Sequence, residues 1–490
     1  MPQDDGAEVG QVSEAARGLG FTSKGEVLAK AEEYWNPGKT RFWVGTGVDL
    51  VIDRREGYYL YDMTGKRLID VHLNGGTYNL GHRNPEVVRA VTQAMQHFDI
   101  GKHHFPSMAR TALAEALVTS APPGMGKVIY GSGGGEAIDI ALKTARHATQ
   151  KRKIVSVVKA YHGHTGLAVN TGDERFSQLF LADVPEEFPH VPFNDLDAME
   201  AALRGRDVAA VIMETIPATY GFPLPQPGYL EAVKALCERY DALYIADEVQ
   251  TGLMRTGELW AITKHGITPD ILVTGKGISG GLYPIAAVVV SDRCAGWLDE
   301  DGFAHMSTFG GAELGCIAAL KTLEICSRPE TRSMVHYISD AITRGLREIQ
   351  DTYPDWFVGI RANGVVMGLE FDHPQGATYV MKRLYEGGVW AIFSTLDPRV
   401  LQYKPGILLT ADQCEELLMR TETAIGLARD DAARDGWRGG TPRRTTAPAA
   451  AASPAVSGVS SDDGGAYVTT RNGRRVPVRT TSPVRRAVTR

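Results

Sequence analysis

Residues 243–290 decide the fold and read LYIADEVQTGLMRTGELWAITKHGITPDILVTGKGISGGLYPIAAVVV. This stretch contains three short apolar runs with glycine, proline or polar residues at their borders: LYIA (243–246), ILVT (271–274) and IAAVVV (285–290). Short continuous apolar runs of this kind indicate strands that are buried on both faces. The first run is followed by Asp247, and the second is followed by Lys276 between two glycines. A chemically useful residue therefore stands at the end of each of two predicted strands.

The alternation of short strands and helical patterns extends from this stretch back to Lys127. Further strands are predicted at KVIY (127–130), IVSVV (154–158) and VAAVIM (208–213). Between the strands, helical patterns cover 136–149, 196–203 and 229–240. Strands that alternate with helices predict an α/β fold with a sheet covered on both faces.

A second, smaller region is predicted from the two ends of the chain. Residues 57–71, GYYLYDMTGKRLIDV, read as two strands around a turn, and strands at 365–371 and 401–403 precede a closing helix at 411–434. We therefore divide the chain into a flexible N-terminus (1–20), the N-terminal part of a small domain (21–75), a large domain (76–352), the C-terminal part of the small domain (353–436) and a tail (437–490).

Composition excludes several classes of protein. Of the 490 residues, 43% are hydrophobic and 22% are charged, which is ordinary for a globular chain and excludes wholesale disorder. The apolar run 284–290 is far shorter than the roughly 18–20 residues of a membrane span, so we expect no membrane association. The N-terminal MPQDDGAEVG is acidic where a secretory signal is basic and then apolar. Five widely spaced cysteines indicate free thiols in a reducing compartment, so we expect a cytoplasmic protein: Cys237, Cys294, Cys316, Cys326 and Cys414.

The tail, residues 437–490, differs in composition from the rest of the chain. It contains ten arginines, no lysine and two aspartates, a net charge of +8 that leaves −14 for residues 1–436. Without Leu, Ile, Met or Phe it cannot bury enough apolar surface to offset the entropy of ordering. We expect a disordered basic tail that is either simply solvated or contacts RNA, an acidic partner or the acidic body of the chain. Within it, 467–470 and 476–478 could form a small hairpin.

A glycine-rich run follows the predicted strand 127–130 and opens a helix. Gly131-Ser132-Gly133-Gly134-Gly135 can present backbone N–H groups and the positive end of the helix dipole to a phosphate. These glycines could equally serve a tight turn, and the run lacks the spacing of a dinucleotide-binding motif.

Three other predicted strands end in side chains suited to catalysis. A buried Asp247 would need a cationic partner, although a helix cap or a structural ion pair would also explain it. Lys276 has a free approach to a ligand and becomes nucleophilic if desolvated, although most lysines are surface residues. Tyr161, His162 and His164 follow strand 154–158. Two imidazoles suggest a metal, but no acidic or cysteine ligand stands at matching spacing, so we expect no metal site.

Taken together, these features suit one cofactor, pyridoxal phosphate. The glycine run would hold its phosphate, and the aromatic side chain would stack on its ring. The carboxylate would keep the pyridine nitrogen protonated, and the lysine would hold the aldehyde as a Schiff base.

The chain resembles the class III aminotransferases, which are fold type I pyridoxal-phosphate enzymes, from about Asn36 to Arg429. The resemblance implies a large domain with a mostly parallel seven-stranded sheet between helices, and a smaller α+β domain from the N- and C-terminal segments. It rests on six segments in order: NLGHRNPEVVRAV (79–91), SGGGEAIDIALKTAR (132–146), AYHGHTG (160–166), ADEVQTGLMRTG (246–257), TGKGISGGLYPIAAV (274–288) and STFGGAELGCIAAL (307–320).

The resemblance also implies roles around the cofactor ring. Lys276 looks like the Schiff-base lysine and the catalytic residue, and Asp247 looks like the partner of the pyridine nitrogen. Gln250 would bond the ring hydroxyl, and Tyr161 would stack on the ring. The resemblance also places His162 among the cofactor-binding residues.

Other implied contacts lie at the phosphate and between subunits. Gly134 and Gly135 would donate backbone N–H groups to the phosphate, and Glu214 belongs to the same expected site. Thr308 resembles the threonine that reaches the phosphate of the neighbouring subunit. The resemblance therefore implies a homodimer with shared active sites and leaves open whether dimers pair into tetramers.

Departures from the family pattern concern the substrate. Many members carry Ser or Thr where Gly135 stands, and Thr219 replaces the glutamate that ornithine and acetylornithine enzymes use. The arginine that commonly clamps an α-carboxylate is Gln402 here, in the stretch Gln402-Tyr403-Lys404-Pro405-Gly406. This stretch is more similar to the alanine–glyoxylate type and its phospho-lyase relatives than to the ornithine branch. Lys404 could contact a carboxylate or phosphate, or could be a surface strand residue.

The expected activity is a ping-pong transamination from an amine or amino acid to a keto or aldehyde acceptor, with Lys276 moving the proton. Trp43 and Tyr78 are candidates for the pocket wall, with core packing as the alternative. A phospho-lyase, a decarboxylase or an amino-acid epimerase on the same scaffold is the first rival. A non-catalytic scaffold protein is disfavoured by the intact Lys276, Asp247 and Tyr161. No nucleic acid is expected except through the tail.

Overall fold

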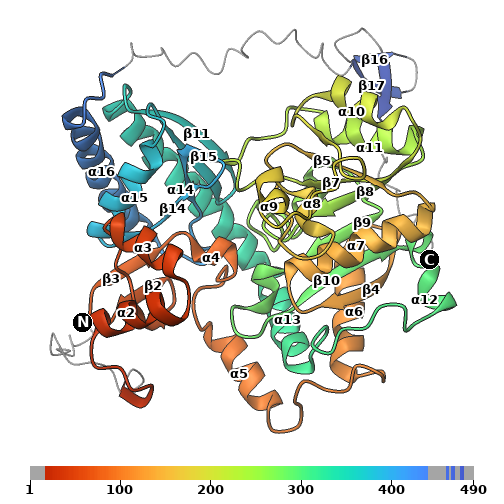
Figure 1. The fold of residues 1–490 in the computed structure, drawn as a ribbon, viewed down its shortest axis with the longest axis horizontal. Coiled ribbons are helices and arrows are strands. Elements are labelled where there is room, and N and C mark those ends of the chain that lie inside the picture. The colour runs from red at the N-terminus through yellow and green to blue at the C-terminus, as the bar shows by residue number, and fades with distance from the viewer. Residues whose placement is uncertain (1–16, 440–459, 463–464, 470–474, 479–490) are drawn as a thin grey trace, which may run out of the picture.

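A seven-stranded sheet forms the centre of the larger part of the molecule (Figure 1). The computed structural model describes residues 17–439, 460–462, 465–469 and 475–478. In spatial order the strands are β4 (Met125–Gly131), β10 (Ala286–Ser291), β9 (Ile271–Thr274), β8 (Leu243–Asp247), β7 (Val208–Glu214), β5 (Lys153–Val157) and β6 (His190–Val191). β10 runs antiparallel to both of its neighbours, whereas the pairs from β9 to β6 are parallel. The predicted α/β fold with a mostly parallel seven-stranded sheet is confirmed.

The strands are apolar throughout because helices cover both faces of the sheet. Along β8, Ile245 packs in one core with α7 (Gly134–Thr149), whereas Tyr244 and Ala246 belong to a second core with α11 (Tyr229–Arg239). Every residue of β7 and β8 is buried. Successive side chains of a strand point to opposite faces, so a strand between two helical layers needs a continuous apolar run.

Further helices surround this sheet and connect its strands. The α-helices are α5 (Pro85–Ala94), α6 (Met108–Ser120), α8 (Ala168–Thr171), α9 (Glu174–Gln178), α10 (Leu196–Leu203), α12 (Trp297–Glu300) and α13 (Glu313–Cys326). Short 3₁₀ helices are η1 (Ala261–His265), η2 (Lys276–Ser279) and η3 (Asp292–Cys294).

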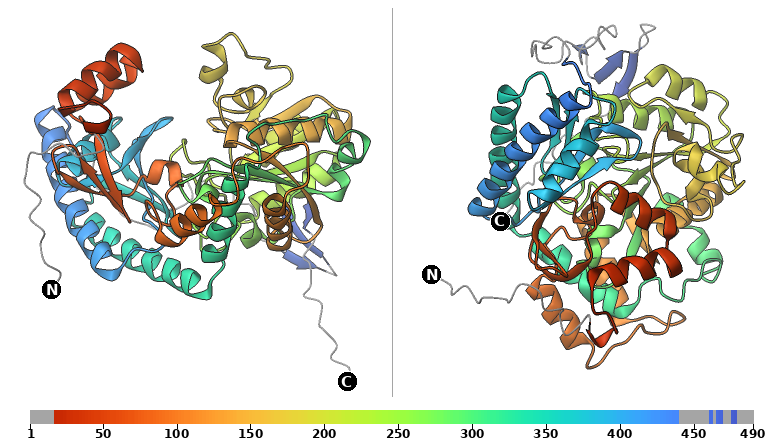
Figure 2. Two further views of the ribbon diagram at one scale, coloured as in Figure 1. Left: turned by 90° about the horizontal axis from the view of Figure 1, so that it is seen from below. Right: turned by 60° about the vertical axis from the view of Figure 1, so that its left-hand side comes forward.

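The N- and C-terminal segments build the second part, and Figure 2 shows the two parts side by side. One sheet has the order β1 (Ile52–Glu56), β2 (Tyr59–Asp62), β3 (Arg67–Asp70), β13 (Val389–Trp390), and the other β11 (Phe357–Asn363), β12 (Val366–Phe371), β15 (Asp397–Tyr403), β14 (Ile392–Ser394). The parallel pairing of β13 with β3 joins the two ends of the body through backbone hydrogen bonds. The helices of this part are α2 (Lys24–Tyr34), α3 (Pro37–Gly45), α4 (Leu73–Gly76), α14 (Pro329–Thr352), α15 (Gly376–Glu386) and α16 (Ala411–Arg434).

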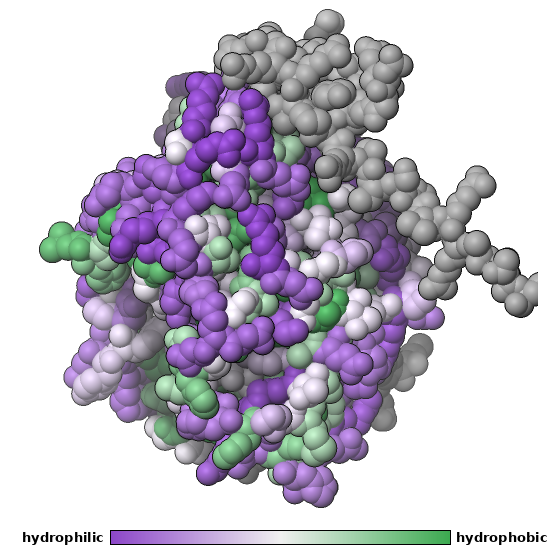
Figure 3. Space-filling view, turned by 90° about the vertical axis from the view of Figure 1, so that its right-hand side faces the viewer, coloured by the Kyte–Doolittle hydropathy of each residue, from purple (hydrophilic) through white to green (hydrophobic). Residues whose placement is uncertain are grey.

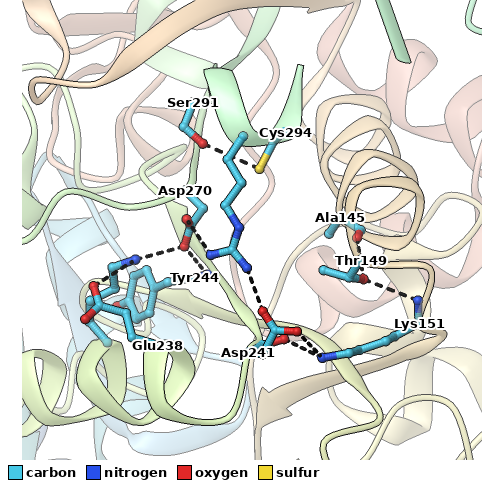
Figure 4. Close-up of polar contacts among 11 residues, drawn as sticks. Ala145, Thr149, Lys151, Glu238, Asp241, Tyr244, Asp270, Ser291 and Cys294 are labelled. Carbon is cyan, nitrogen blue, oxygen red and sulfur yellow. Dashed lines mark hydrogen bonds and ion pairs between the residues drawn. The ribbon is translucent and has the colours of Figure 1, made fainter. Parts of the chain in front are cut away.

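A network of ion pairs and hydrogen bonds holds the amino ends of the parallel strands (Figure 4). Asp270, just before β9, accepts hydrogen bonds from Lys234 Nζ and from the backbone N–H of Tyr244, each at 2.9 Å. Asp241, just before β8, pairs with Arg293 at 3.0 Å and with Lys151 at 3.3 Å. Because this network lies at the amino ends, the opposite ends of the same strands are free to carry other side chains.

Part of the tail also carries strands. β17 (Gly465–Thr469) and β18 (Arg475–Val478) pair antiparallel, which confirms the expected hairpin, and β16 (Ser460–Asp462) adds a third strand. β18 lies against α11. Most of the predicted disordered tail falls outside the described residues, but Trp437 does not: its indole packs on Trp356 at 4.9 Å and donates to Asp372 O at 2.7 Å.

The described residues contain neither a membrane-spanning helix nor a cluster of metal ligands. None of the described helices combines the length and the apolar character that a membrane crossing requires. Within the same residues, no group of three or more His, Cys, Asp or Glu side chains is arranged to hold a metal ion. Figure 3 shows that the face on the right of Figure 1 is mostly hydrophilic, with hydrophobic residues in scattered spots.

Candidate active site

The predicted site residues converge where the parallel strands end. Glu214, Asp247 and Lys276 stand at or just after the carboxyl ends of the adjacent strands β7, β8 and β9. Glu214 is the register partner of Asp247, and Asp247 is the register partner of Val273. Carboxyl ends of parallel strands are the place where open α/β sheets bind their ligands.

Asp247 and His162 form a buried pair. His162 Nδ1 lies 2.7 Å from Asp247 Oδ2, and Asp247 Oδ1 accepts a hydrogen bond from the Val249 N–H at 3.0 Å. His162 is 3% exposed and Asp247 is 4% exposed. His162 and the Val249 N–H therefore hold the carboxylate in one orientation. A carboxylate that interacts with a single atom of a ligand needs to be held in this way.

Glu214 is a buried carboxyl beside this pair. Its Oε1 accepts from the Tyr161 N–H at 3.1 Å, and its Oε2 accepts from the Ala218 N–H at 3.0 Å. Burial raises the pKa of Glu214 to about 7, with the charge of Asp247 adding to the rise and His162 opposing it. Glu214 therefore ties the loop that carries Tyr161 and His162 to the end of β7.

Lys276 begins η2 with a left-handed backbone, at φ 45°. Burial lowers the pKa of its amine, and the charges of Asp247 and Glu214 oppose that fall. A lowered pKa increases the share of neutral, nucleophilic amine. Gly75 leaves room for the side chain, since a Cβ at Gly75 would lie 3.0 Å from Lys276 Cε.

The glycine run forms the start of α7. The helix begins at Gly134, and its N-cap Gly133 offers no side chain to the first backbone N–H groups. These donors and the helix dipole are thus available to an anion. A Cβ at Gly135 would lie 2.8 Å from Thr165 Oγ1, which hydrogen-bonds to Asp139 Oδ2 at 2.8 Å. Thr165, to which the sequence analysis assigns no role, therefore places a hydroxyl beside the position where many family members carry Ser or Thr.

Gln250 and Tyr161 complete this group. Gln250 Nε2 is buried and lacks a hydrogen-bond partner among the described residues, and Gln250 Oε1 lies 3.7 Å from the Cβ position of Gly75. The half-buried Tyr161 ring lies 5.1 Å from the His164 ring and 6.0 Å from the Phe176 ring.

Gln402 and Lys404 are buried at the junction of the two parts. Lys404 Nζ donates to Gln402 Oε1 at 2.6 Å and lies 5.5 Å from the centre of the Phe222 ring. Lys404 has no exposed surface, so the alternative of a surface strand residue is wrong. Strand β15 places Lys404 in the interior because its backbone N–H is bonded to Val71 O at 2.8 Å.

The other predicted residues lie around this junction or away from it. The Trp43 ring contacts the Trp390 ring edge to face at 5.5 Å, and Trp390 lies 6.4 Å from the His72 ring. Tyr78 packs on His82 at 3.9 Å and on the backbone of Gly281. Thr308 lies in an exposed loop between α12 and α13. Sequence reasoning missed His72 and Trp390 because no local motif marks them.

The residues present fit pyridoxal phosphate. An uncapped glycine helix start suits a phosphate, and the unpartnered amide of Gln250 suits a ring hydroxyl. A carboxylate held by His162 suits a protonated pyridine nitrogen, and a lysine of lowered pKa suits an aldehyde carbon. Each feature of the cofactor thus has a counterpart at the same edge of the sheet.

Comparison with known proteins agrees with this geometry. The family model described as "Aminotransferase class-III" matches residues 44–425. An uncharacterized aminotransferase from Archaeoglobus fulgidus is 39% identical over 413 residues, which cover 84% of this chain and 97% of that protein. Among solved structures, the ornithine aminotransferase from Toxoplasma gondii is 25% identical with a TM-score of 0.78, over 85% of this chain and 99% of that one. N-acetylornithine aminotransferase from Stenotrophomonas maltophilia is 26% identical with a TM-score of 0.68, over 79% and 97%.

These neighbours do not support the expected closeness to the alanine–glyoxylate and phospho-lyase branch. They do support the cofactor, because a second structure of the Toxoplasma gondii enzyme is described with partial occupancy of pyridoxal phosphate at the active site. Fold, site and family model agree from one end of the body to the other: this chain belongs to the class III aminotransferases, which depend on pyridoxal phosphate.

Proposed function

We propose that this chain transfers an amino group from an amine or amino acid to a keto or aldehyde acceptor by a ping-pong mechanism. The observation that carries the proposal is the placement of Lys276, Asp247 and the start of α7 at one edge of the sheet. When bound there, the cofactor supplies an electron-accepting ring and a carbonyl carbon.

The protein residues divide the work between binding and proton transfer. Backbone N–H groups of Gly134 and Gly135 bind the phosphate, and the Gln250 amide bonds the ring hydroxyl. The Tyr161 ring covers the cofactor ring and excludes water from it. Lys276 Nζ would move the proton between the amine-bearing carbon of the substrate and the carbon that the cofactor supplies, in one direction with the donor and in the opposite direction with the acceptor.

Asp247 acts on the proton of the pyridine nitrogen. His162 Nδ1, at 2.7 Å, keeps the carboxylate aimed at one atom. Glu214 holds the backbone of Tyr161 and thereby positions the loop that carries His162. Removal of either positioning side chain is expected to lower the rate of proton transfer more than the affinity for substrate.

We also propose a homodimer in which Thr308 reaches the phosphate site of the neighbouring subunit. The loop that carries Thr308 is flanked by large hydrophobic side chains that are more than half exposed, which we call the apolar patch: Phe105, Met108, Phe303, Met306 and Phe309. Arg110 joins its two segments by bonding Phe105 O at 2.9 Å and Gly311 O at 3.3 Å. Such a patch favours burial against another protein surface.

The dimer is tested by Phe309→Asp. Sedimentation velocity is expected to show a dimer for the wild type and monomers for the variant, with weaker cofactor retention in the variant. A wild-type monomer that retains the cofactor would contradict the shared site.

The substrates of the solved neighbours cannot be assigned directly to this chain. Thr219 and Gln402 stand where the ornithine-type enzymes carry a glutamate and an arginine, and Gln402 offers no charge. We therefore favour an amine, an ω-amino acid or a pyruvate-type pair over glutamate and 2-oxoglutarate. The buried, unpaired cysteines support a reducing, cytoplasmic environment.

The decisive experiment is the visible spectrum of the purified holoenzyme with a panel of amines and amino acids. A cofactor band that bleaches with one class of donor and returns with a keto acid supports transamination and identifies the donor. Release of phosphate, release of CO₂ or loss of optical activity without return of the band by a keto acid would instead favour the phospho-lyase, decarboxylase or epimerase.

A further inference from the structure

Lys404 is a buried lysine at the junction of the two parts of the molecule. It follows β15 of the smaller part, yet its Nζ faces the Phe222 ring of the larger part at 5.5 Å. The Lys404 side chain does not contact solvent, since the residue is 0% exposed. Lys276, at the end of β9, is near enough for its charge to act on Lys404, and both Lys276 and His72 are partly exposed.

Within the described part of the chain, no carboxylate forms an ion pair with this lysine. Among residues 17–439, no Asp or Glu oxygen lies within 4.0 Å of Lys404 Nζ, and its hydrogen-bond acceptor is the neutral amide of Gln402 at 2.6 Å. Asp70 contributes some favourable charge, but its Oδ2 is engaged by His82 Nε2 at 2.9 Å. An isolated cation is costly to bury.

The neighbouring charges increase that cost. Burial, with the neighbouring basic groups of Arg255 and Lys276, lowers the pKa of Lys404 well below its usual range. Arg255 is itself 1% exposed, and its Nε and Nη1 lack partners among the described residues. His72, also at this junction, has a pKa lowered by burial and by the charges of Lys404 and Lys276. The junction therefore gathers basic groups without a counter-charge and buried N–H donors without acceptors, and an anionic ligand would supply both.

We infer that Lys404 is the receptor for an oxyanionic end group of the substrate, held opposite the amine that meets Lys276. The inference rests on the proposed function, because it concerns the donor and acceptor of the same site. It assigns the substrate class: an amino compound, and a matching carbonyl acceptor, that carries a carboxylate or a phosphate.

Gln402 and the aromatic residues suit this role. The Gln402 amide uses one of the three Nζ protons and leaves two for an oxyanion. Phe222 packs beside Lys404 Nζ, and the partly exposed rings of Trp390 and Trp43 lie near His72, where the carbon chain of a substrate would meet apolar surface. An arginine at 402 would clamp an anion by itself; here the neutral Gln402 orients the neighbouring lysine instead.

The test measures binding without turnover, on holoenzyme that shows its full visible cofactor band. The probes are butanoate, propylphosphonate and uncharged 1-butanol, which lack an amine and cannot react, and calorimetry gives the dissociation constants. Lys404→Met removes the charge. Gln402→Glu keeps the shape and places a carboxylate on Lys404 Nζ, so it blocks the receptor without leaving a cavity. Lys264→Met is the matched control, because Lys264 Nζ binds Asn363 Oδ1 away from this junction.

We expect one of the anions to bind the wild type and the control alike, and to bind both junction variants about tenfold to a hundredfold more weakly, the loss typical of a charge-assisted hydrogen bond. Stronger binding of butanoate assigns a carboxylate substrate, and stronger binding of propylphosphonate assigns a phosphate substrate. Equal anion affinity in all four proteins, or 1-butanol binding as tightly as both anions, would overturn the inference. Failure of transamination shows separately, as a band that no amine bleaches.

Discussion

Glu214→Gln gives a test of the buried charges around the site that does not depend on the substrate. The pKa of Glu214 is raised from 4.5 to about 7 in the folded protein. Between these two pH values the folded protein holds a proton that the unfolded chain has lost. Stability therefore falls as pH rises through this window, by up to about 1.4 kcal/mol per pH unit. Glutamine does not titrate, so the variant lacks this loss.

The size of the effect follows from the width of the window. A shift of this size corresponds to a loss of about 3 kcal/mol in wild-type stability between pH 4.5 and 7, relative to the variant. The glutamine also has a constant cost: one of the backbone N–H groups of Tyr161 and Ala218 loses its acceptor, worth about 1–3 kcal/mol at any pH. The variant should therefore be less stable at pH 5 and equal to or more stable than the wild type at pH 8.

The assay is the melting temperature of both proteins with saturating cofactor from pH 5 to pH 8. At about 2 °C per kcal/mol, the difference between variant and wild type should change by several degrees up to pH 7 and then level off. Glu26→Gln is the control, because hydrogen bonds from Thr22 and Lys30 lower the pKa of that surface carboxylate to about 2, so it stays ionised throughout. A difference for Glu214→Gln that is as flat as the control would refute the raised pKa.

Three further predictions concern other parts of the molecule. Gly135→Ser should weaken cofactor binding, measured by equilibrium dialysis, because its Cβ would lie 2.8 Å from Thr165 Oγ1, and adding Thr165→Ala should restore it. Asp270→Ala should lower stability to urea by about 1–3 kcal/mol, since it leaves the buried Tyr244 N–H without an acceptor and leaves the partly buried Lys234 only its longer pair with Glu238 at 3.6 Å, with little change in the cofactor band. Truncation after Gly439 should leave turnover within twofold; a tenfold loss would show that the tail takes part in catalysis.

The sheet and the residues at its carboxyl ends could be predicted because each is marked locally. A buried parallel strand needs a continuous apolar run, and β8 and β9 each show one followed by Asp247 or Lys276. Glu214, at the end of the equally apolar β7, was expected from the family resemblance. The topology then places these three residues together without further information. The smaller part was harder to predict: β1 begins at Ile52, before the predicted first strand, because edge strands with one solvent face carry charged residues such as Arg54.

The junction around Lys404 could not be predicted, because it depends on contacts between segments far apart in the sequence. The pairing of β3 with β13 brings His72 near Trp390, and β15 turns Lys404 inward beside Phe222. None of these residues stands in a pattern of its own. For that reason the sequence left two interpretations of Lys404, a ligand contact or a surface residue. Its complete burial in the structure excludes the surface residue.

The cofactor site and the junction also differ in how far family membership determines their residues. The cofactor groups come from loops at the ends of one sheet, where each residue is fixed by strand register and by bonds such as His162 to Asp247. Those constraints are internal to the larger part, so they persist whatever the substrate. The residues around Lys404 come from both parts, and their spacing depends on how β15 and β3 approach the larger part. A replacement such as glutamine at 402 changes the charge of that junction without disturbing the cofactor groups. On the two proposals made above, the edge of the sheet sets the reaction, and the junction selects the substrate.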